Sequence, residues 1–194
     1  MLKKKSIIIV SFMGVDGSGK TTLTKQVKKK FKHSTYLHLK PYIVVKDLRR
    51  VIRNPHKETK SSFIISIIRI ISWLVSYKIF FYKNTKKSKK IYLFDRYAHD
   101  ILIDPLRYKH SLPIGLTKLM LSFFPKPDLW VFLKPSITTL KLRKQELSEQ
   151  ELKRQTKEYS FFFKNKKNVI KIDSKINRKT LTLKIKKRID FINK

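Results

Sequence analysis

The amino-acid sequence predicts an α/β protein, in which a parallel sheet of about five strands carries helices on both faces, giving three layers. Two observations lead to this prediction. Short apolar segments alternate along the chain with longer helical stretches, a pattern typical of parallel strands joined by helical crossovers. In addition, three of the four glycines lie within six residues, directly after the first apolar segment. A strand that turns sharply into a helix is expected there.

The expected elements follow one another in a regular order. The first strand is the apolar run of residues 6–12, and the first helix covers residues 22–31. Further strands are expected at residues 36–39, 91–94, 129–133 and 168–173, and further helices at residues 62–82, 136–145, 149–163 and 178–192. With 194 residues, of which 41% are hydrophobic, the chain is expected to form a single domain over residues 1–194.

The glycine-rich segment has the spacing G-x-x-x-x-G-K-[ST]. A turn of this kind points successive backbone N–H groups at one place, and the helix N-terminus adds partial positive charge there. In this motif the lysine reaches the β- and γ-phosphates and the hydroxyl holds Mg²⁺. The sequence therefore predicts a three-layer P-loop NTPase fold that binds ATP with Mg²⁺. The predicted phosphate-binding residues are Gly14, Val15, Asp16, Gly17, Ser18, Gly19, Lys20, Thr21 and Thr22.

Acidic residues are scarce, and three of the thirteen lie together between residues 95 and 104. Asp95 directly follows the strand at residues 91–94, and we predict that it holds Mg²⁺ together with Thr21, directly or through water. Its neighbour Arg96 is predicted to clamp a second phosphate. The alternative is an internal network of Asp95 and Arg96 that only fixes the loop.

Phosphoryl transfer requires that the charge on the moving group be neutralised, commonly by Mg²⁺ and an arginine. The phosphate loop offers only Lys20, so the arginine must come from elsewhere. We choose Arg143 and Arg154, which lie in a mixed-charge segment beyond the strand at residues 129–133. This segment, about residues 141–160, is predicted to be a lid that closes over ATP and excludes water. The alternative is a charged helix that is merely solvated. Lys20, Asp95, Arg96, Arg143 and Arg154 thus form the predicted catalytic set.

Residues 62–82 form the most apolar segment of the chain. Arg69 and Lys78 interrupt it, so no uncharged run approaches the roughly 20 residues that a spanning helix needs. We therefore expect no transmembrane segment, but a long helix against the sheet with Arg69 turned toward the active cleft. The alternative is peripheral contact with anionic lipid, because the basic stretch of residues 83–90 follows directly.

The chain has a formal net charge of +34, more than two bound nucleotides require. Such a surplus predicts nonspecific binding of polyanions at low salt. The basic residues are mostly lysines spread along the chain, and coding bias toward A/T-rich codons is the alternative explanation. The chain contains no cysteine, which excludes disulfides and thiolate metal sites. The basic and apolar start imitates a signal peptide, but we interpret it as a buried strand of a cytoplasmic protein.

The chain resembles the thymidylate kinase family of nucleoside monophosphate kinases. The resemblance rests on the segment G-V-D-G-S-G-K-T-T at residues 14–22, on F-D-R-Y at residues 94–97, on P-D-L-W-V-F-L at residues 127–133 and on the arginines that follow. It implies an ATP-dependent kinase that converts dTMP to dTDP, with Asp16 on the acceptor sugar, Arg96 on the acceptor phosphate, and Arg69 and Tyr97 in the acceptor site. It also implies the lid around Arg143 and Arg154, and a possible homodimer through the long apolar helix.

Two departures from the family pattern concern the acceptor. The usual E-P-G-G-T-like segment after the second strand is absent, and Lys40-Pro41-Tyr42-Ile43-Val44 stands in its place. Where the family reads the thymine ring with an aromatic and an arginine, this chain offers Arg69 with Phe63 or Trp73. Two alternatives therefore stay open: a P-loop kinase of another small phosphorylated or hydroxylated metabolite, and a non-catalytic nucleotide-dependent binding module.

Overall fold

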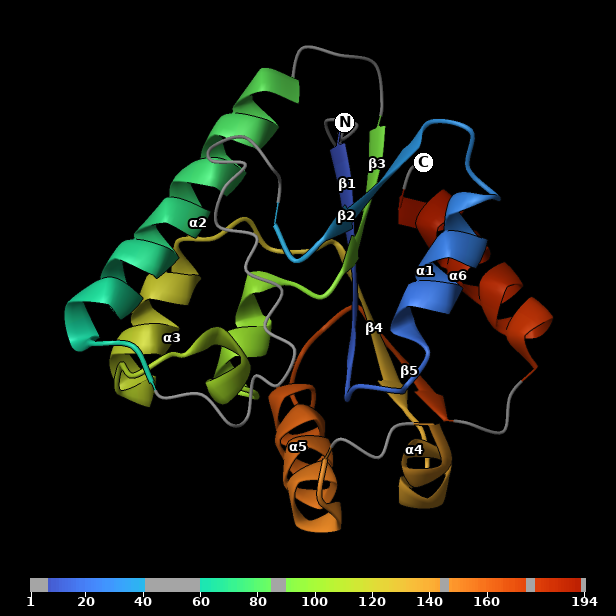
Figure 1. The fold of residues 1–194 in the computed structure, drawn as a ribbon. Coiled ribbons are helices and arrows are strands. Elements are labelled where there is room, and N and C mark those ends of the chain that lie inside the picture. Colours follow the sequence, from blue (N-terminus) through green and yellow to red (C-terminus); the bar gives the residue numbers. More distant parts are fainter. Residues whose placement is uncertain (1–6, 41–59, 85–89, 144–146, 174–176, 193–194) are drawn as a thin grey trace. The chain divides into compact units, whose positions relative to one another are not determined.

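The computed structural model describes residues 7–40, 60–84, 90–143, 147–173 and 177–192 (Figure 1). The chain divides into two compact units. Unit 1 comprises residues 1–38, 87–97 and 126–194, and unit 2 comprises residues 39–86 and 98–125. The expectation of a single domain over residues 1–194 stays a prediction.

Unit 1 is built on a sheet of five parallel strands in the order β2-β3-β1-β4-β5. This arrangement confirms the predicted α/β fold. Because β1 lies in the middle, with β3 on one side and β4 on the other, the loop that follows β1 emerges at the centre of the sheet edge where parallel strands bind ligands. The strands are β1 (Ile7–Gly14), β2 (Ser34–His38), β3 (Lys90–Asp95), β4 (Leu129–Lys134) and β5 (Val169–Asp173).

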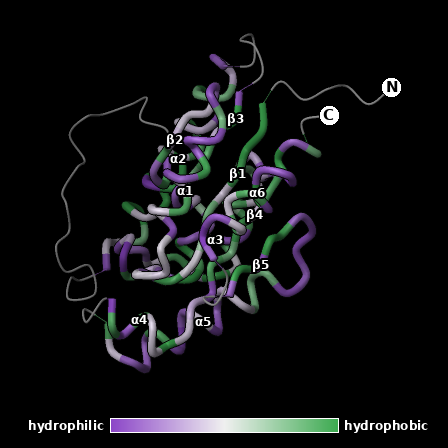
Figure 2. The backbone as a smooth tube through the Cα atoms, turned by 90° about the vertical axis from the view of Figure 1, so that its right-hand side faces the viewer, coloured by the Kyte–Doolittle hydropathy of each residue, from purple (hydrophilic) through white to green (hydrophobic). Residues whose placement is uncertain are grey.

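Helices cover both faces of this sheet. Alternate residues of β1, β3, β4 and β5 form one apolar core with α1 (Lys20–Lys28) and α6 (Arg178–Ile192). On the other face, Trp130 and Phe132 of β4 contact aromatic rings of α5 (Glu149–Phe162) and of Phe163, which directly follows it. The strand residues are therefore apolar on both sides, as parallel strands between two helical layers require. In Figure 2 the charged helix α5 carries far more purple than the strands.

The observed boundaries differ from the expected ones by a few residues. Helix α1 begins at Lys20 rather than at residue 22, because Gly19 takes up the left-handed conformation, with φ of 89°, that starts the helix. Helix α4 (Ile137–Arg143) ends at the last described residue before the gap at 144–146. Part of the predicted lid therefore lies outside the described residues.

Unit 2 contains α2 (Phe63–Asn84), α3 (Ile114–Ser122) and two 3₁₀ turns, Ala98–Leu102 and Leu106–Tyr108. Helix α3 was not expected, because it is short and contains Gly115 directly after Pro113 and Ile114. One face of α2 is buried, with Ser66, Ile70, Trp73, Tyr77 and Phe81 recurring every three or four residues. Tyr77 also meets Phe124, with ring centroids 5.4 Å apart.

Helix α2 is long and apolar enough, by length and composition alone, to cross a membrane: it has 22 residues, and a window of mean hydropathy 1.8 that is 28% buried. The core helix of a globular protein passes the same test. The expectation that this segment does not span a membrane stays a prediction.

Candidate functional site in unit 1

The glycine-rich loop between β1 and α1 is shaped by close backbone packing. Gly14 has φ of 150°, and a Cβ atom on it would lie 2.4 Å from the carbonyl oxygen of Leu133 on the neighbouring strand. No side chain fits in that space. Gly19 then turns the loop into α1, so that the first backbone N–H groups of the helix face the loop. Local sterics thus explain why glycine stands at both positions.

Lys20 is directed back into this loop. Its side chain is 5% exposed, and its Nζ donates to the carbonyl oxygen of Val15 at 2.9 Å. The carboxylate of Asp16 lies 3.8 Å from the same atom. The ammonium group is therefore held inside the ring of loop atoms, where it can attract a phosphate group.

Asp95 lies at the end of β3, where the sheet register pairs it with Phe12 of β1 and with His38 of β2. Its Oδ2 accepts hydrogen bonds from Thr21 Oγ1 at 2.6 Å and from the Tyr36 hydroxyl at 2.9 Å. The sequence prediction that Thr21 and Asp95 come together is thus matched by a direct contact.

The surroundings of Asp95 keep it ionised. Burial raises the pKa of this carboxyl group, but His38, Thr21, the charge of Lys20 and Tyr36 outweigh that effect and hold the pKa at about 2. His38 Nδ1 lies 3.7 Å from Asp95 Oδ2, so it acts as a polar neighbour rather than through a short hydrogen bond.

The residues present fit a magnesium ion. Asp95 is 1% exposed, and among the described residues its second oxygen, Oδ1, has no hydrogen-bond partner. A buried, ionised oxygen without a partner is unfavourable unless a cation or water completes it. An ionised carboxylate beside a threonine hydroxyl is also the donor set that Mg²⁺ prefers. Within the described residues, no cluster of three or more His, Cys, Asp or Glu could hold a metal by itself.

Arg96 follows Asp95 in a strained backbone conformation, with φ of 72°. Its backbone N–H donates to the carbonyl oxygen of Phe12 at 2.9 Å, and its guanidinium donates to the carboxylate of Asp16. Two anchors in the first strand and its loop therefore fix this arginine, which is 5% exposed. The internal partner of Arg96 is therefore Asp16, whereas the alternative expected from the sequence was a network of Arg96 with Asp95. The role of Arg96 as a phosphate clamp stays a prediction.

Tyr97 completes the F-D-R-Y segment but lies in the core of unit 1. It is fully buried, and its ring meets the edges of Phe94 and Trp130 at centroid distances of 5.0 and 5.8 Å. Burial and the charge of Asp128 raise the pKa of its hydroxyl well above the ordinary value. A role of Tyr97 in acceptor binding stays a prediction.

The two lid arginines have different surroundings. Arg143, at the end of α4, donates from Nη1 to the carbonyl oxygen of Gly17 at 3.4 Å, so α4 brings it to the phosphate loop. Arg154, in α5, donates to both carboxylate oxygens of Glu151 on the same helix, at 2.8 and 2.6 Å. Arg69 belongs to unit 2, where its guanidinium donates to the carbonyl oxygens of Tyr108 and Lys109.

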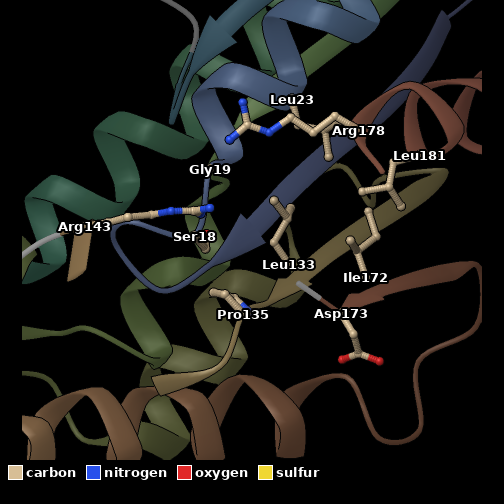
Figure 3. A pocket seen from close by; sticks show the side chains of 10 residues that line it. All are labelled: Ser18, Gly19, Leu23, Leu133, Pro135, Arg143, Ile172, Asp173, Arg178 and Leu181. Atoms are coloured by element: carbon tan, nitrogen blue, oxygen red, sulfur yellow. The ribbon is translucent and has the colours of Figure 1, made fainter. Parts of the chain in front are cut away.

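A pocket of about 90 Å³ lies beside the phosphate loop (Figure 3). Leu23, Leu133, Ile172 and Leu181 give it apolar walls. Figure 3 shows the side chains of Arg143 and Arg178 reaching toward Gly19 from opposite sides, whereas the carboxylate of Asp173 points away. The remaining lining residues are Ser18 and Pro135.

Sequence reasoning missed three residues near this site: Tyr36, His38 and Arg178. Tyr36 and His38 belong to a strand that was expected at residues 36–39, and position alone could have placed them at its ligand-binding end. Arg178 is the first residue of α6, as expected, yet nothing in its sequence surroundings distinguishes it from the other basic residues of a strongly basic chain.

The model of the thymidylate kinase family matches residues 12–193. The chain belongs to the thymidylate kinase family. No curated protein sequence matches the chain. Among solved structures, a thymidylate kinase from Candida albicans superposes with a TM-score of 0.61 at 15% identity, covering 96% of this chain and 93% of the other. A deoxyadenosine kinase from M. mycoides, with dCMP and dCDP bound, superposes with the same TM-score at 17% identity, covering 94% and 99%.

Membership of the thymidylate kinase family supports nucleotide kinase activity, and thymidylate kinases generally use ATP with Mg²⁺. The two structural likenesses show only the fold, because both sequence identities are below 20%.

Proposed function

We propose that this member of the thymidylate kinase family transfers the γ-phosphoryl group of ATP to a nucleoside monophosphate, with dTMP as the expected acceptor. The observation that carries this proposal is the direct contact between Thr21 of the phosphate loop and the ionised carboxylate of Asp95. This contact supports a role of Thr21 and Asp95 in holding Mg²⁺, beside the place where Lys20 and the loop N–H groups would hold a triphosphate. The proposed phosphate-binding set is residues 14–22.

In the proposed reaction, an oxygen of the acceptor phosphate attacks the γ-phosphorus. The bond from that phosphorus to the oxygen shared with the β-phosphate breaks, and ADP leaves with the electron pair. No general base is needed, because a phosphate monoester is largely ionised at neutral pH. Lys20, Arg143 and Arg154 would neutralise the charge of the transferred group. Mg²⁺ held by Thr21 and Asp95 would supply further charge neutralisation when bound.

Arg96 is proposed to position the acceptor phosphate. Its guanidinium is anchored by Asp16, so it presents fixed donors without a large loss of side-chain entropy. Asp16 is proposed to contact the acceptor sugar as well. Arg69 and Tyr97 complete the proposed acceptor set, as the family resemblance implies.

The pocket of Figure 3 is proposed to receive the base of the donor nucleotide. It begins at Ser18 and Gly19, where the phosphates would end, and its apolar walls suit the faces of a purine. Guanidinium groups stack well on aromatic rings. Arg143 and Arg178 are therefore proposed to cover the base from two sides.

An acceptor panel tests the kinase proposal. ADP release is measured with ATP, Mg²⁺ and each of dTMP, dUMP, dAMP, dCMP and dGMP, and we expect turnover to be stimulated most by dTMP. Lys20→Ala should lower turnover by about 100-fold or more, while Lys25→Ala, an exposed lysine of the same helix, should leave it unchanged. Folded protein that releases ADP with none of these acceptors would contradict the proposal.

A second candidate is a kinase that phosphorylates the hydroxyl group of a deoxynucleoside. It is favoured by the deoxyadenosine kinase structures among the neighbours, which align over 94% of this chain. Deoxynucleosides are therefore added to the panel. Mass spectrometry of the products separates the two candidates, since one forms a diphosphate and the other a monophosphate.

We further propose a homodimer through the outer face of α2. Ile64, Ile68, Ile71 and Val75 are 67%, 59%, 46% and 43% exposed, and their spacing of four, three and four residues is that of a helix-packing seam. Sedimentation at micromolar concentration should report a dimer, and Ile68→Lys should convert it to a monomer. A monomeric wild-type protein would contradict this proposal.

The net charge of +34 supports nonspecific binding of polyanions. We expect binding of single-stranded and double-stranded nucleic acid to fall steeply as salt rises, without sequence preference. A cytoplasmic location stays a prediction.

A further inference from the structure

An open groove of about 500 Å³ lies in unit 1, between the start of β5 and the C-terminal half of α6. Val169 and Ile170 of β5 contribute its apolar part. The groove lies at the edge of the sheet, because β5 is the outermost strand beside β4. The pocket next to the phosphate loop is found at the other end of β5, where Asp173 lines it. Roughly 16 Å of extended chain separates Asn168 from Asp173, so the two sites are different.

The helical side of the groove is a stripe of three cations that ends in an aromatic ring. It consists of Lys184, Lys187, Arg188 and Phe191. Their spacing of three, one and three residues puts them on one face of α6. All four side chains are exposed. The stripe therefore offers positive charge on successive helical turns, about 5.4 Å apart, and a planar apolar surface at its end.

Within the part of the chain that the structure describes, no ion pair neutralises this stripe. Helix α6 carries six basic residues and one acidic residue, Asp190. The carboxylate of Asp190 pairs with Lys186 at 2.7 Å, outside the stripe. The charges of Lys184, Lys187 and Arg188 are thus uncompensated. A row of such cations on a surface attracts a polyanion.

Phe191 presents its ring to solvent beside these cations. The side chain is 68% exposed, although the guanidinium of Arg188 lies 5.4 Å from the ring centroid. Arg188 is held there in part by Asn168, whose Oδ1 accepts from its Nη2 at 3.4 Å. Because a cation over a ring occupies one face only, the exposed remainder of the ring can take another planar group.

We propose that this groove binds single-stranded nucleic acid, with phosphates along the stripe and one base stacked on Phe191. Single-strand sites without sequence preference combine a cationic track for the backbone with aromatic rings for the bases, and both parts lie here on one helix face. A duplex keeps its base faces inside the stack, so it can use the cations but not the ring. Binding through net charge alone makes no such distinction. The proposal stands whether or not the chain is a kinase.

Fluorescence anisotropy of the full-length protein with a short labelled oligothymidylate, and with a labelled duplex of the same length, tests the ring. Phe191→Ala should weaken single-strand binding about tenfold at every salt concentration, because one base loses its stacking partner. Binding of the duplex should not change, and Phe191→Trp should restore binding of the single strand. The matched control is Phe161→Ala, which removes a 72% exposed ring from α5 of the same unit and should bind like the wild type.

The salt dependence of the same binding tests the cations. Lys184→Gln and Lys187→Gln should each lower the slope of log K against log salt by about 0.7, the contribution of one phosphate contact on a single strand. Lys179→Gln, an exposed lysine at the other end of α6, should leave the slope unchanged. Saturating ATP with Mg²⁺ should not displace the strand, since the phosphate loop lies elsewhere in unit 1.

Photocrosslinking locates the base directly. An oligonucleotide that carries 5-iodouracil is irradiated on the protein, and peptide mass spectrometry should find the crosslink at Phe191. The proposal is overturned if Phe191→Ala binds the single strand as well as Phe161→Ala does, or if it weakens duplex binding equally. It is also overturned if ATP or polyglutamate displaces the strand as effectively as unlabelled oligothymidylate, which would indicate the phosphate loop or an acidic peptide instead. None of these results would bear on the kinase assay.

Discussion

Acidification below about pH 6.5 should destabilise unit 2 through His110. The ring is 3% exposed, and its Nε2 lies 2.7 Å from Thr117 Oγ1. That hydroxyl donates to the carbonyl oxygen of Pro113 at 3.0 Å, so it accepts from His110 and assigns the proton to Nε2. Nδ1 is buried and has no hydrogen-bond partner among the described residues. Protonation at Nδ1 therefore buries an uncompensated charge.

The size of the effect follows from the two pKa values of His110. The folded value is about 4 and the ordinary value is 6.5, so the unfolded chain binds more protons between these values and stability falls as pH falls. The stabilisation is fully present above about pH 6.5 and is lost progressively toward pH 4. Between pH 7 and pH 5 the free energy of unfolding should fall by roughly 2 kcal/mol.

Urea denaturation at pH 7, 6 and 5 measures this loss. Trp73 reports on unit 2, and the substitution Trp130→Phe removes the second tryptophan. His110→Gln keeps a donor for Thr117 but cannot be protonated, so its stability should change little over the same range. Asp95 does not interfere, because its stabilising contribution is lost only between its ordinary pKa of 3.8 and its folded pKa of about 2. An equal loss of stability in the wild type and in His110→Gln would refute the reasoning.

Three further substitutions test the site of unit 1. Gly14→Ala places a Cβ 2.4 Å from the carbonyl oxygen of Leu133. In a thermal melt it should lower the free energy of unfolding by about 2–4 kcal/mol. The control is Gly115→Ala, which should not destabilise the protein because its Cβ meets nothing within 4 Å. Asp95→Asn should weaken Mg²⁺-dependent ATP binding at least tenfold by calorimetry, and unchanged binding would count against the metal assignment. Arg178→Ala should raise KM for ATP several-fold without altering inhibition by tripolyphosphate, and equal effects on both would place Arg178 at the phosphates instead.

The sheet could be predicted because its strands are buried on both faces. A strand that is covered by helices on both faces is apolar along its whole length. Such nearly continuous apolar runs occur at residues 7–14, 91–94 and 129–133. The phosphate loop was equally visible, since its glycines, lysine and threonine form one contiguous motif of fixed spacing. Short elements of unit 2 were not visible, because tertiary packing rather than local propensity forms helix α3 and the two 3₁₀ turns.

The partners of the site residues were harder to predict than the residues themselves. Thr21 and Asp95 were expected together, because a loop after one strand and the end of its neighbour meet at one edge of a parallel sheet. That Tyr36 would also reach Asp95 depends on β2 lying beside β3, and strand order cannot be read from an apolar pattern. Nothing in the sequence gives a reason to prefer Arg143 over Arg154. The structure distinguishes them, because Arg143 contacts Gly17 of the phosphate loop whereas Arg154 pairs with Glu151 of its own helix.

Lys40 shows how a departure from a family pattern becomes physical information. The family resemblance leads one to expect a glutamate-containing segment after the second strand, and this chain has a lysine and a proline there. The structure places the Lys40 ammonium 5.7 Å from the ring centroid of Trp73, which lies one helical turn from Arg69 on α2, and the charge of Arg69, after burial, lowers the pKa of Lys40. A ligand that suits a carboxylate at this point cannot suit an ammonium group.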